Sequence, residues 1–545
     1  MSSQRLGAAL VAYLALMQPQ VAFGDLPVHC LRHQLLGEWE LHLSGLSPHR
    51  TSCGHQRPDV EVVQSQGIEQ ATGSKMITLQ EPNLVHTSTG AAGTFTMIYD
   101  EAFEVRVDNL TFFAFSRFEK MKDGKTDHSH CGETARGWYR DADRTQWGCY
   151  YGKKVKEAPL SFLSMVQPTP AFEPSANYDR PLNLDWHQER VDQLNAKHTK
   201  WTARIYDRFV GLSLRQLNAI AGIRRVVPRE AQHNPYPQKP ASLMEIKTSD
   251  CPDMPHHKPG EVLPHLLLSR PKPCQLRNVA IFTQPADKHT EAVEKTMPKS
   301  HDWKNFVAPV MDQSDCGSCY MVSTIRMLTA RHRISTNNTK AEPWSISFPL
   351  HCSEYNQGCK GGYGFLASKW SEDIGLLPDS CAPYDTQGSC SVKCDISKLK
   401  KRWRAANHRY IGGFYGGSGA GDMMKEVFQH GPVVVSFEPS DEFMFYSGGV
   451  FTSSKDSPAA PLSAHDKEWQ QVDHAVLCTG WGSEFGDKYW LVQNSWGESW
   501  GENGYFRIHR GSNEAGVESI AVAADVVEET RPEVLEQFLA ENSAR

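Results

Sequence analysis

Fourteen cysteines are the feature that most constrains how this chain of 545 residues can fold. Cysteines pair into disulfides in an oxidising compartment, but bind metal or remain reduced elsewhere. The N-terminus favours the oxidising case. One arginine, an apolar run over residues 6–17 and small residues spaced as a cleavage site predict a signal peptide, residues 1–24, cut before Asp25. The apolar run is shorter than the ~20 residues that cross a bilayer, which disfavours a membrane anchor.

Along the chain the cysteines fall into four groups: Cys30, Cys53, Cys131 and Cys149; Cys251 and Cys274; Cys316, Cys319, Cys352, Cys359, Cys381, Cys390 and Cys394; and Cys478. Only Cys316 and Cys319 have the two-residue spacing of a redox or zinc motif, and paired zinc ligands would need a second such pair. A metal site is therefore not expected. Nucleic acid is also a poor partner, because the 57 basic and 63 acidic side chains include no basic tract.

The length predicts two or three domains. Residues 25–152 carry short alternating apolar runs between turn residues, which predict an antiparallel sheet or small β-barrel. Residues 153–298 begin with a helical stripe from Val191 to Ile205 and end in polar, proline-rich sequence. That pattern is typical of either a removable propeptide or an interdomain spacer. From residue 299 onward a predicted helix is followed by several predicted strands, which indicates an α+β domain with two lobes.

This last region contains the groups that a nucleophilic thiol needs. Cys319 lies at a predicted helix N-terminus, where the helix dipole and a nearby imidazolium lower a thiol pKa and make the thiolate available as a nucleophile. His474 begins an apolar strand and is the candidate base, although a lone histidine at such a place is more often structural. Asn494 could orient the imidazole, shielded by the indole of Trp496. The side-chain amide of Gln313 could join the Cys319 backbone N–H as an oxyanion donor.

The segments QSDCGSCY, VDHAV and QNSWGESWGENGYF resemble the papain-like cysteine proteases, and the resemblance extends over residues 301–524. Nearer the N-terminus, DLPVHCLRHQLLGEWELHLSG and CGETARGWYRDADRTQWGC resemble the exclusion domain of the cathepsin C branch of that family, as do Tyr320 and the run IGGFYGG. The resemblance leaves Cys319 and Cys478 outside any disulfide. It implies five pairs: Cys30–Cys131, Cys53–Cys149, Cys316–Cys359, Cys352–Cys390 and Cys381–Cys394.

The resemblance also implies a fold and an activity. The expected fold is α+β: a papain-like two-lobe catalytic domain, residues 299–545, preceded by an antiparallel β-barrel exclusion domain, residues 25–152, and a partly helical activation propeptide, residues 153–298. Cleavage in the loop 453–470 is expected to give a heavy-chain part of about 299–455 and a light-chain part of about 456–545. The expected function is an aminodipeptidase that releases N-terminal dipeptides through a thioester acyl-enzyme; the alternative is a cathepsin L-like endopeptidase.

Two other classes of function are disfavoured. A thiol–disulfide oxidoreductase using Cys316 and Cys319 would need a thioredoxin-like βαβ pattern around the motif, and would give His474 and Asn494 no task. A catalytically inactive binding protein is disfavoured because every catalytic position carries the required chemistry.

Substrate-binding groups are assigned by the same resemblance. Asp25 would bind the free N-terminal ammonium of the substrate, since a buried charge needs a partner. Gly361, Gly362 and Phe365 would line the substrate-binding site together with Trp496. Members of the branch bind chloride there through a tyrosine hydroxyl, but the aligned residue here is Phe365. We therefore expect weak or absent activation by chloride, unless Tyr363 supplies the hydroxyl, and no other cofactor or metal.

Expected partners are peptides and proteins with a free N-terminus, an activating protease and, by resemblance, further copies of the chain in a homotetramer. The expected location is the secretory pathway, leading to a lysosome, a similar acidic vacuole or the exterior. Asn109 and Asn337 lie in N-glycosylation sequons. The pair Cys251 and Cys274 has no role that the resemblance explains. The polar tail 528–545 is expected to be a solvated, helical end.

Overall fold

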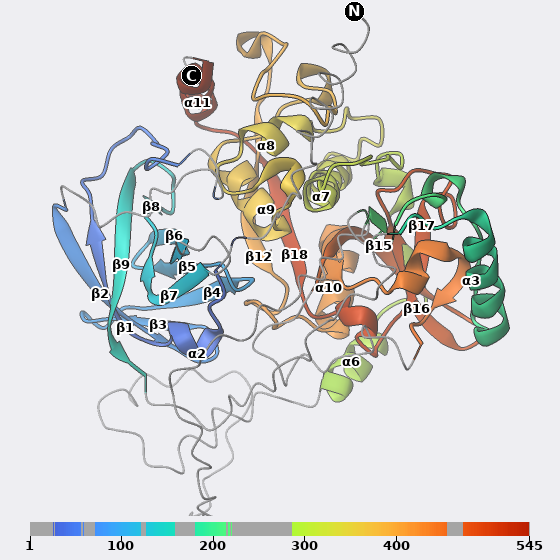
Figure 1. The fold of residues 1–545 in the computed structure, drawn as a ribbon. Coiled ribbons are helices and arrows are strands. Elements are labelled where there is room, and N and C mark those ends of the chain that lie inside the picture. The colour runs from blue at the N-terminus through green and yellow to red at the C-terminus, as the bar shows by residue number, and fades with distance from the viewer. Residues whose placement is uncertain are drawn as a thin grey trace, which may run out of the picture.

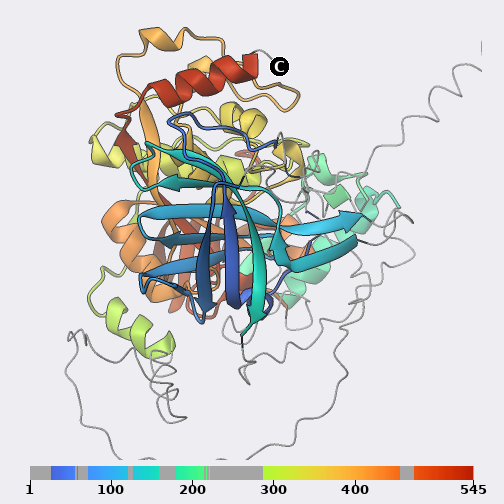
Figure 2. The ribbon, with the colours of Figure 1, turned by 90° about the vertical axis from the view of Figure 1, so that its left-hand side faces the viewer.

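The computed structural model describes residues 26, 28–55, 58, 71–120, 127–158, 180–213, 216–217, 220, 286–454 and 472–543. Four predicted features lie outside the described residues: the signal peptide, Asp25, the pair Cys251 and Cys274, and most of the candidate cleavage loop. Figure 1 shows an N-terminal domain of strands, a central group of helices and a second, strand-rich region on the opposite side of those helices; in Figure 2 the N-terminal domain faces the viewer.

The N-terminal domain, here called the barrel domain, is a nine-stranded antiparallel sheet. It closes because β1 (Gly37–Leu43) pairs with both β2 (Gly73–Gln80) and β9 (Trp147–Glu157). The remaining elements are α2 (Arg32–Leu35), β3 (Leu84–Thr87), β4 (Ala92–Ile98), β5 (Ala102–Val107), β6 (Leu110–Lys120), β7 (Asp127–Thr134) and β8 (Gly137–Asp141). Alternate residues of β1, such as Trp39 and Leu41, are buried, as the period-2 pattern requires. The predicted antiparallel barrel is confirmed, and β9 continues past the expected boundary at residue 152.

The C-terminal domain joins a helical lobe to a strand-rich lobe, as the sequence predicts. The helical lobe contains α7 (Cys319–Ser335), α8 (Ser347–Cys352) and α9 (Gly364–Asp373). Strands of the other lobe form a sheet of order β10-β14-β17-β16-β15-β13-β18-β12, and β11 pairs with β15.

Bounds of these strands are β10 (Trp201–Ala203), β11 (His301–Asp302), β12 (Trp403–Tyr410), β13 (Val433–Phe437), β14 (Tyr446–Phe451), β15 (His474–Glu484), β16 (Asp487–Gln493), β17 (Tyr505–His509) and β18 (Ala521–Glu528). Helices α6 (Ala286–Glu294) and α10 (Ala420–His430) pack against each other. Short 3-10 helices are η1 (Asp207–Phe209), η4 (Lys304–Phe306), η5 (Gly358–Lys360), η6 (Asp379–Cys381), η7 (Ile396–Lys398), η8 (Asp441–Phe445) and η10 (Glu514–Gly516).

Residues 180–213, here called the α3 segment, come from the part expected to be a propeptide or spacer. The predicted helix is present as α3 (Leu184–Lys197), but the stripe that the sequence extends to Ile205 ends earlier. Beyond Lys197 the chain becomes β10, because its backbone pairs with the edge strand β14 of the C-terminal domain. Val191 and Leu194 join the core of the strand-rich lobe. The segment therefore folds onto the C-terminal domain, on the side away from the barrel domain (Figure 1).

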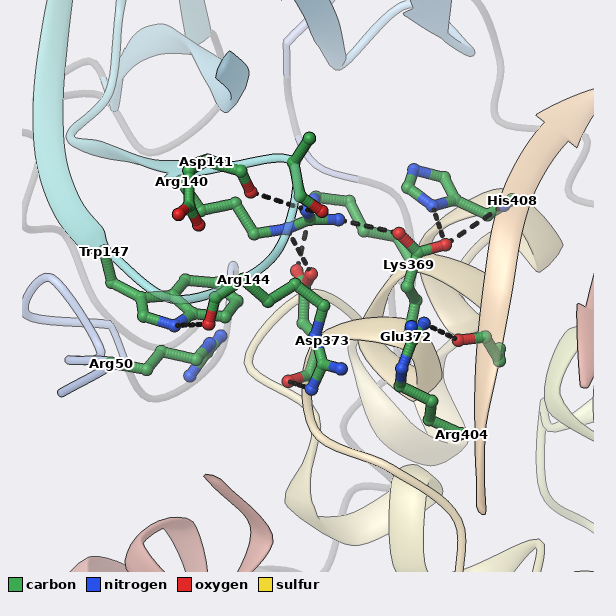
Figure 3. Close-up of polar contacts among 12 residues, drawn as sticks. Arg50, Arg140, Asp141, Arg144, Trp147, Lys369, Glu372, Asp373, Arg404 and His408 are labelled. Carbon is green, nitrogen blue, oxygen red and sulfur yellow. Dashed lines mark hydrogen bonds and ion pairs between the residues drawn. The ribbon is translucent and has the colours of Figure 1, made fainter. Parts of the chain in front are cut away.

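Buried charges join the barrel domain to the helical lobe (Figure 3). Arg140 of β8 donates to Glu372 and Asp373 of α9 at 2.7 and 2.8 Å. His408 of β12 lies 2.9 Å from a carboxylate oxygen of Glu372 and 2.9 Å from one of Glu104 on β5. Arg140 exposes only 4% of its side chain and Asp373 only 1%. These pairs are core contacts that fix the two domains to each other.

The C-terminal tail differs from the solvated end that was expected. Its helix α11 (Glu533–Ser543) buries Val534, Leu535 and Phe538 against the helical lobe. The Phe538 ring lies 5.4 Å from that of Trp370 on α9. That expectation is wrong because the polar sequence hides three apolar residues at helical spacing, which form one buried face.

Candidate active site

Cys319 is the first residue of α7, directly after Ser318. Its backbone N–H is one of the four at a helix start that have no partner within the helix, and the dipole of the helix favours negative charge there. The side chain is outside any disulfide, and the residue is 9% exposed. A thiolate at this position is therefore stabilised before any other group is considered.

Cys316 has the separate, structural task that the resemblance implied. It is bonded to Cys359, and the N–H of Gly317 donates to the Cys359 carbonyl at 2.8 Å. A Cβ on Gly317 would lie 2.7 Å from that carbonyl oxygen, so only glycine fits the close approach. The disulfide thus clamps the loop that leads into the nucleophile, and the Cys-x-x-Cys spacing does not mark a redox pair.

His474 begins β15, which packs against α7. Its Nε2 lies 2.8 Å from Oδ1 of Asn494, and that oxygen also accepts the Ser495 backbone N–H. Because an amide oxygen can only accept, Nε2 must carry the proton, which leaves Nδ1 with its lone pair. Nδ1 is buried and has no hydrogen-bond partner among the described residues. This is the tautomer that can accept a proton from the thiol of Cys319.

Burial lowers the pKa of His474 to about 4, although the hydrogen bond that the imidazole donates to Asn494 acts in the opposite direction. The imidazole is therefore neutral, and ready to act as a base, over the mildly acidic and neutral range. The Trp496 ring stacks on it with centroids 5.0 Å apart and planes 24° apart. Trp496 is fully buried, so the indole keeps water away from the bond between His474 and Asn494.

Gln313 is held in a fixed orientation beside the nucleophile. Its Nε2 donates to the Cys316 carbonyl at 2.9 Å, and its Oε1 accepts the hydroxyl of Ser495. Its backbone N–H also donates to the Ser495 carbonyl at 2.8 Å. The amide nitrogen carries a second N–H, which can stabilise an oxyanion together with the Cys319 backbone N–H.

Sequence reasoning missed two residues that support this arrangement. The hydroxyl of Tyr384 donates to the Gln313 carbonyl at 2.9 Å and lies 2.7 Å from the hydroxyl of Ser318. Ser495 orients Gln313 from the other side. Ser495 sits inside the motif that contains Asn494, so its position was a usable signal. Tyr384 lies 71 residues from Gln313 and gave no local signal.

The glycines predicted to bind substrate follow the helix η5. Gly361 and Gly362 have φ values of 132° and 156°. A Cβ on Gly362 would lie 2.4 Å from Oδ1 of Asn356, so no side chain fits there. The backbone of this stretch is therefore not covered by a side chain of its own. Phe365 lies on α9, where it is 1% exposed and its ring stacks on Tyr410 with centroids 4.6 Å apart. Phe365 thus fills a packed position.

All five predicted disulfides are formed: Cys30–Cys131, Cys53–Cys149, Cys316–Cys359, Cys352–Cys390 and Cys381–Cys394. Cys478 is buried outside them, and burial raises its pKa to about 12. Asn109 and Asn337 are both exposed. Within the described ranges, no group of three or more His, Cys, Asp or Glu side chains could hold a metal ion. In the same ranges, no helix is long and apolar enough to cross a bilayer.

Two family models match the chain. The model of the papain family cysteine protease matches residues 297–525, and that of the cathepsin C exclusion domain matches residues 25–154. Cathepsin C of Schistosoma mansoni is 26% identical over 517 residues, which are 92% of this chain and 95% of the relative. Dipeptidyl aminopeptidase 1 of Plasmodium falciparum (isolate 3D7) is 23% identical over 666 residues, with coverages of 91% and 92%.

A third relative, cathepsin B-like cysteine proteinase 4 of Caenorhabditis elegans, is 31% identical over 265 residues, which are 42% of this chain and 75% of the relative. That match shows the peptidase family, and the two models divide the chain as the fold does. The chain belongs to the papain family of cysteine proteases and carries a cathepsin C exclusion domain at its N-terminus.

Proposed function

We propose that the enzyme is an aminodipeptidase, which hydrolyses the second peptide bond of chains with a free N-terminus. The observation that carries this is a papain-type domain joined through buried charges to an exclusion domain. The buried pairs of Arg140 with Glu372 and Asp373 join the two. An accessory domain that moved freely could not limit how many substrate residues precede the cleaved bond. A domain fixed in place can.

We propose the following reaction for this site. Nδ1 of His474 takes the proton of Cys319, and the thiolate attacks the carbonyl carbon of the second peptide bond. Negative charge on the carbonyl oxygen is stabilised by the Cys319 backbone N–H and the Gln313 amide. The imidazolium then gives its proton to the departing amine, which leaves a thioester. Water, deprotonated by His474, hydrolyses the thioester and releases the dipeptide.

The stop after two residues is assigned to Asp25, whose carboxylate would pair with the ammonium group of the substrate. Asp25 itself lies outside the described residues. In support, the next residue, Leu26, is only 1% exposed, and its N–H donates to Glu101 at 2.8 Å. A buried ammonium without a partner is costly, so a carboxylate there favours a free N-terminus over a blocked one.

Further features of the enzyme are also proposed. Activation by chloride should be weak or absent, because Phe365 has no hydroxyl and the Tyr363 hydroxyl already donates to Glu101 at 3.0 Å. A steep loss of activity on dialysis into chloride-free buffer would contradict this. By likeness to its family, the enzyme is proposed to be a homotetramer, to be cut by an activating protease within 453–470, and to act in a lysosome, an acidic vacuole or the exterior. Its propeptide is proposed to lie between the end of β9 and residue 298.

One assay tests the proposed function. The processed enzyme is given a dipeptidyl substrate with a free amine and the same substrate with the amine blocked, each with and without a thiol alkylator. We expect turnover of the free-amine substrate alone, abolished by the alkylator and by Cys319→Ala. Cys316→Ala should instead reduce secretion, since loss of a disulfide in a secreted domain costs ~2–5 kcal/mol. Equal cleavage of the blocked substrate would support the alternative, a cathepsin L-like endopeptidase.

A further inference from the structure

One carboxylate links the start of the barrel domain to the substrate-binding backbone. Oε1 of Glu101 accepts the N–H of Leu26 at 2.8 Å and the hydroxyl of Tyr363 at 3.0 Å. Tyr363 directly follows Gly361 and Gly362 in the chain. Leu26 and Glu101 belong to the barrel domain and Tyr363 to the C-terminal domain, so this oxygen bridges the two domains.

The turn that carries Glu101 is held on both sides. Between β4 and β5, the Glu101 carbonyl accepts the Ser116 N–H at 2.8 Å, and the neighbouring Asp100 carbonyl accepts the Cys30 N–H at 2.8 Å. Tyr99 in the same turn has a φ of 54° and stacks its ring on Tyr363 with centroids 5.0 Å apart. Glu101 is 3% exposed. The carboxylate therefore has one accessible position, set by the barrel domain on one side and the Tyr363 ring on the other.

A carboxylate suits this place better than a neutral acceptor. Hydrogen bonds to a charged oxygen are roughly twice as strong as those between neutral groups. The Leu26 N–H is buried, so loss of its acceptor would leave that donor unsatisfied and free the chain end to move. Leu26 is covalently joined to Asp25, and any shift of Leu26 moves the attachment point of the proposed ammonium-binding residue.

We propose that Glu101 is a positioning residue for the exopeptidase reaction. Its carboxylate fixes the N-terminal chain end of the barrel domain against the Gly361–Gly362 backbone, and so sets the distance between the ammonium-binding group and Cys319. This inference rests on the proposed function. It assigns to Glu101 no contact with the reacting atoms, so the chemistry at Cys319 should be untouched when the bridge is cut.

The test compares four variants of the processed enzyme. Glu101→Ala removes both bonds. Tyr363→Phe removes only the bond between the domains. Glu101→Gln keeps an oxygen that can accept both donors. Glu38→Ala is the matched control, a half-exposed carboxylate of the same domain that pairs with Lys156. For each, KM and kcat on a free-amine dipeptidyl substrate, the alkylation rate of Cys319 and cleavage of an N-blocked substrate are measured.

We expect Glu101→Ala to raise KM roughly tenfold, the equivalent of about 1.4 kcal/mol, with kcat and the alkylation rate within about twofold of the unaltered enzyme. Cleavage of the N-blocked substrate should become measurable. Tyr363→Phe should raise KM by a smaller factor of about three, while Glu101→Gln should restore most of the loss. Glu38→Ala should behave as the unaltered enzyme.

A KM for Glu101→Ala no higher than that of Glu38→Ala would overturn the inference, as would a fall in kcat or alkylation rate of the same size as the rise in KM. If Glu101→Ala does not fold, Tyr363→Phe decides alone, and an unchanged KM counts against the bridge. Failure of the proposed function gives a different result: the unaltered enzyme itself would cleave blocked and free-amine substrates alike.

Discussion

The barrel domain and the α3 segment are both held against the C-terminal domain, but by different interactions. Arg140 and Asp373, between the barrel domain and α9, expose 4% and 1% of their side chains. Arg208 and Asp312, between the α3 segment and the C-terminal domain, expose 26% and 44%. A buried pair is strongly destabilising to break, whereas an exposed pair contributes little. The charged contacts of the barrel domain are thus buried, whereas the α3 segment is held by apolar packing and strand pairing, and its charged contact is exposed.

Acid weakens the two contacts over different pH ranges. Burial alone would raise the pKa of Asp373, but the charges of Lys369, Arg140 and Arg50 lower it to about 2. Because its folded pKa lies below the ordinary value of ~3.9, its stabilisation persists at any pH above that value and is lost only as pH falls toward 2. In the α3 segment, burial lowers the pKa values of His187 and His198. A histidine that is buried in its neutral form is protonated more readily when it is exposed. As pH falls below ~6.5, protonation therefore favours the undocked state. Of these two contacts, mild acid should therefore loosen the one made by the α3 segment.

The largest effect is expected from Arg140→Met. The change leaves Glu372 and Asp373 buried without their guanidinium partner, which costs ~3–5 kcal/mol. Unfolding of the Cys319→Ala protein in urea, with and without the substitution, measures the difference. The matched control is Arg117→Met, which removes a half-exposed pairing with Glu133 on the barrel surface and should cost less than ~1 kcal/mol. Equal losses in the two variants would contradict the distinction between the two contacts.

A smaller effect, confined to one segment, is expected from acid. His187 on α3 is fully buried against Phe445, with ring centroids 5.5 Å apart. Its neutral form is favoured when α3 is docked, so docking should weaken progressively as pH falls below ~6.5. Hydrogen exchange of the uncut Cys319→Ala protein at pH 7 and pH 4.5 should show loss of protection over α3 and none over β5. His187→Leu should keep α3 protected at pH 4.5, and a variant that opens as readily as the parent would refute the role of this histidine.

The active site could be predicted from sequence because each part sits within a few residues of a local signal. Cys319 begins a helix, His474 begins an apolar strand, and Asn494 lies beside Trp496. Alternating apolar residues predicted the barrel for the same reason. The disulfide pairs came from the resemblance to a family, because spacing alone leaves many pairings open.

The contact between the domains could not be predicted in this way. Arg140 and Glu372 are 232 residues apart, and charged residues are expected at the surface rather than in a core. Nothing near Glu101 or Tyr363 marks them as partners. The end of α3 was misplaced because strand pairing with β14 overrode the helical stripe, an effect of tertiary structure that no local window contains.

The smallest effect should come from Arg208, where the α3 segment reaches the active site. Its guanidinium donates to the two carboxylate oxygens of Asp312 at 2.8 and 3.2 Å and to the Trp496 carbonyl at 2.6 Å. Asp312 precedes Gln313, and Trp496 stacks on His474, so Arg208 ties the segment to both sides of the catalytic group.

The ion pair between Arg208 and Asp312 is partly exposed and should contribute less than ~1 kcal/mol. Arg208→Ala should therefore speed alkylation of Cys319 in the uncut protein by no more than about fivefold and leave the processed enzyme unchanged. Lys200→Ala is the matched control, because Lys200 lies in the same segment and pairs with Asp487 of β16 at 2.6 Å but touches neither active-site loop. Equal acceleration by the two variants would mean that Arg208 acts only through the docking of the whole segment, and not through its contacts beside the nucleophile.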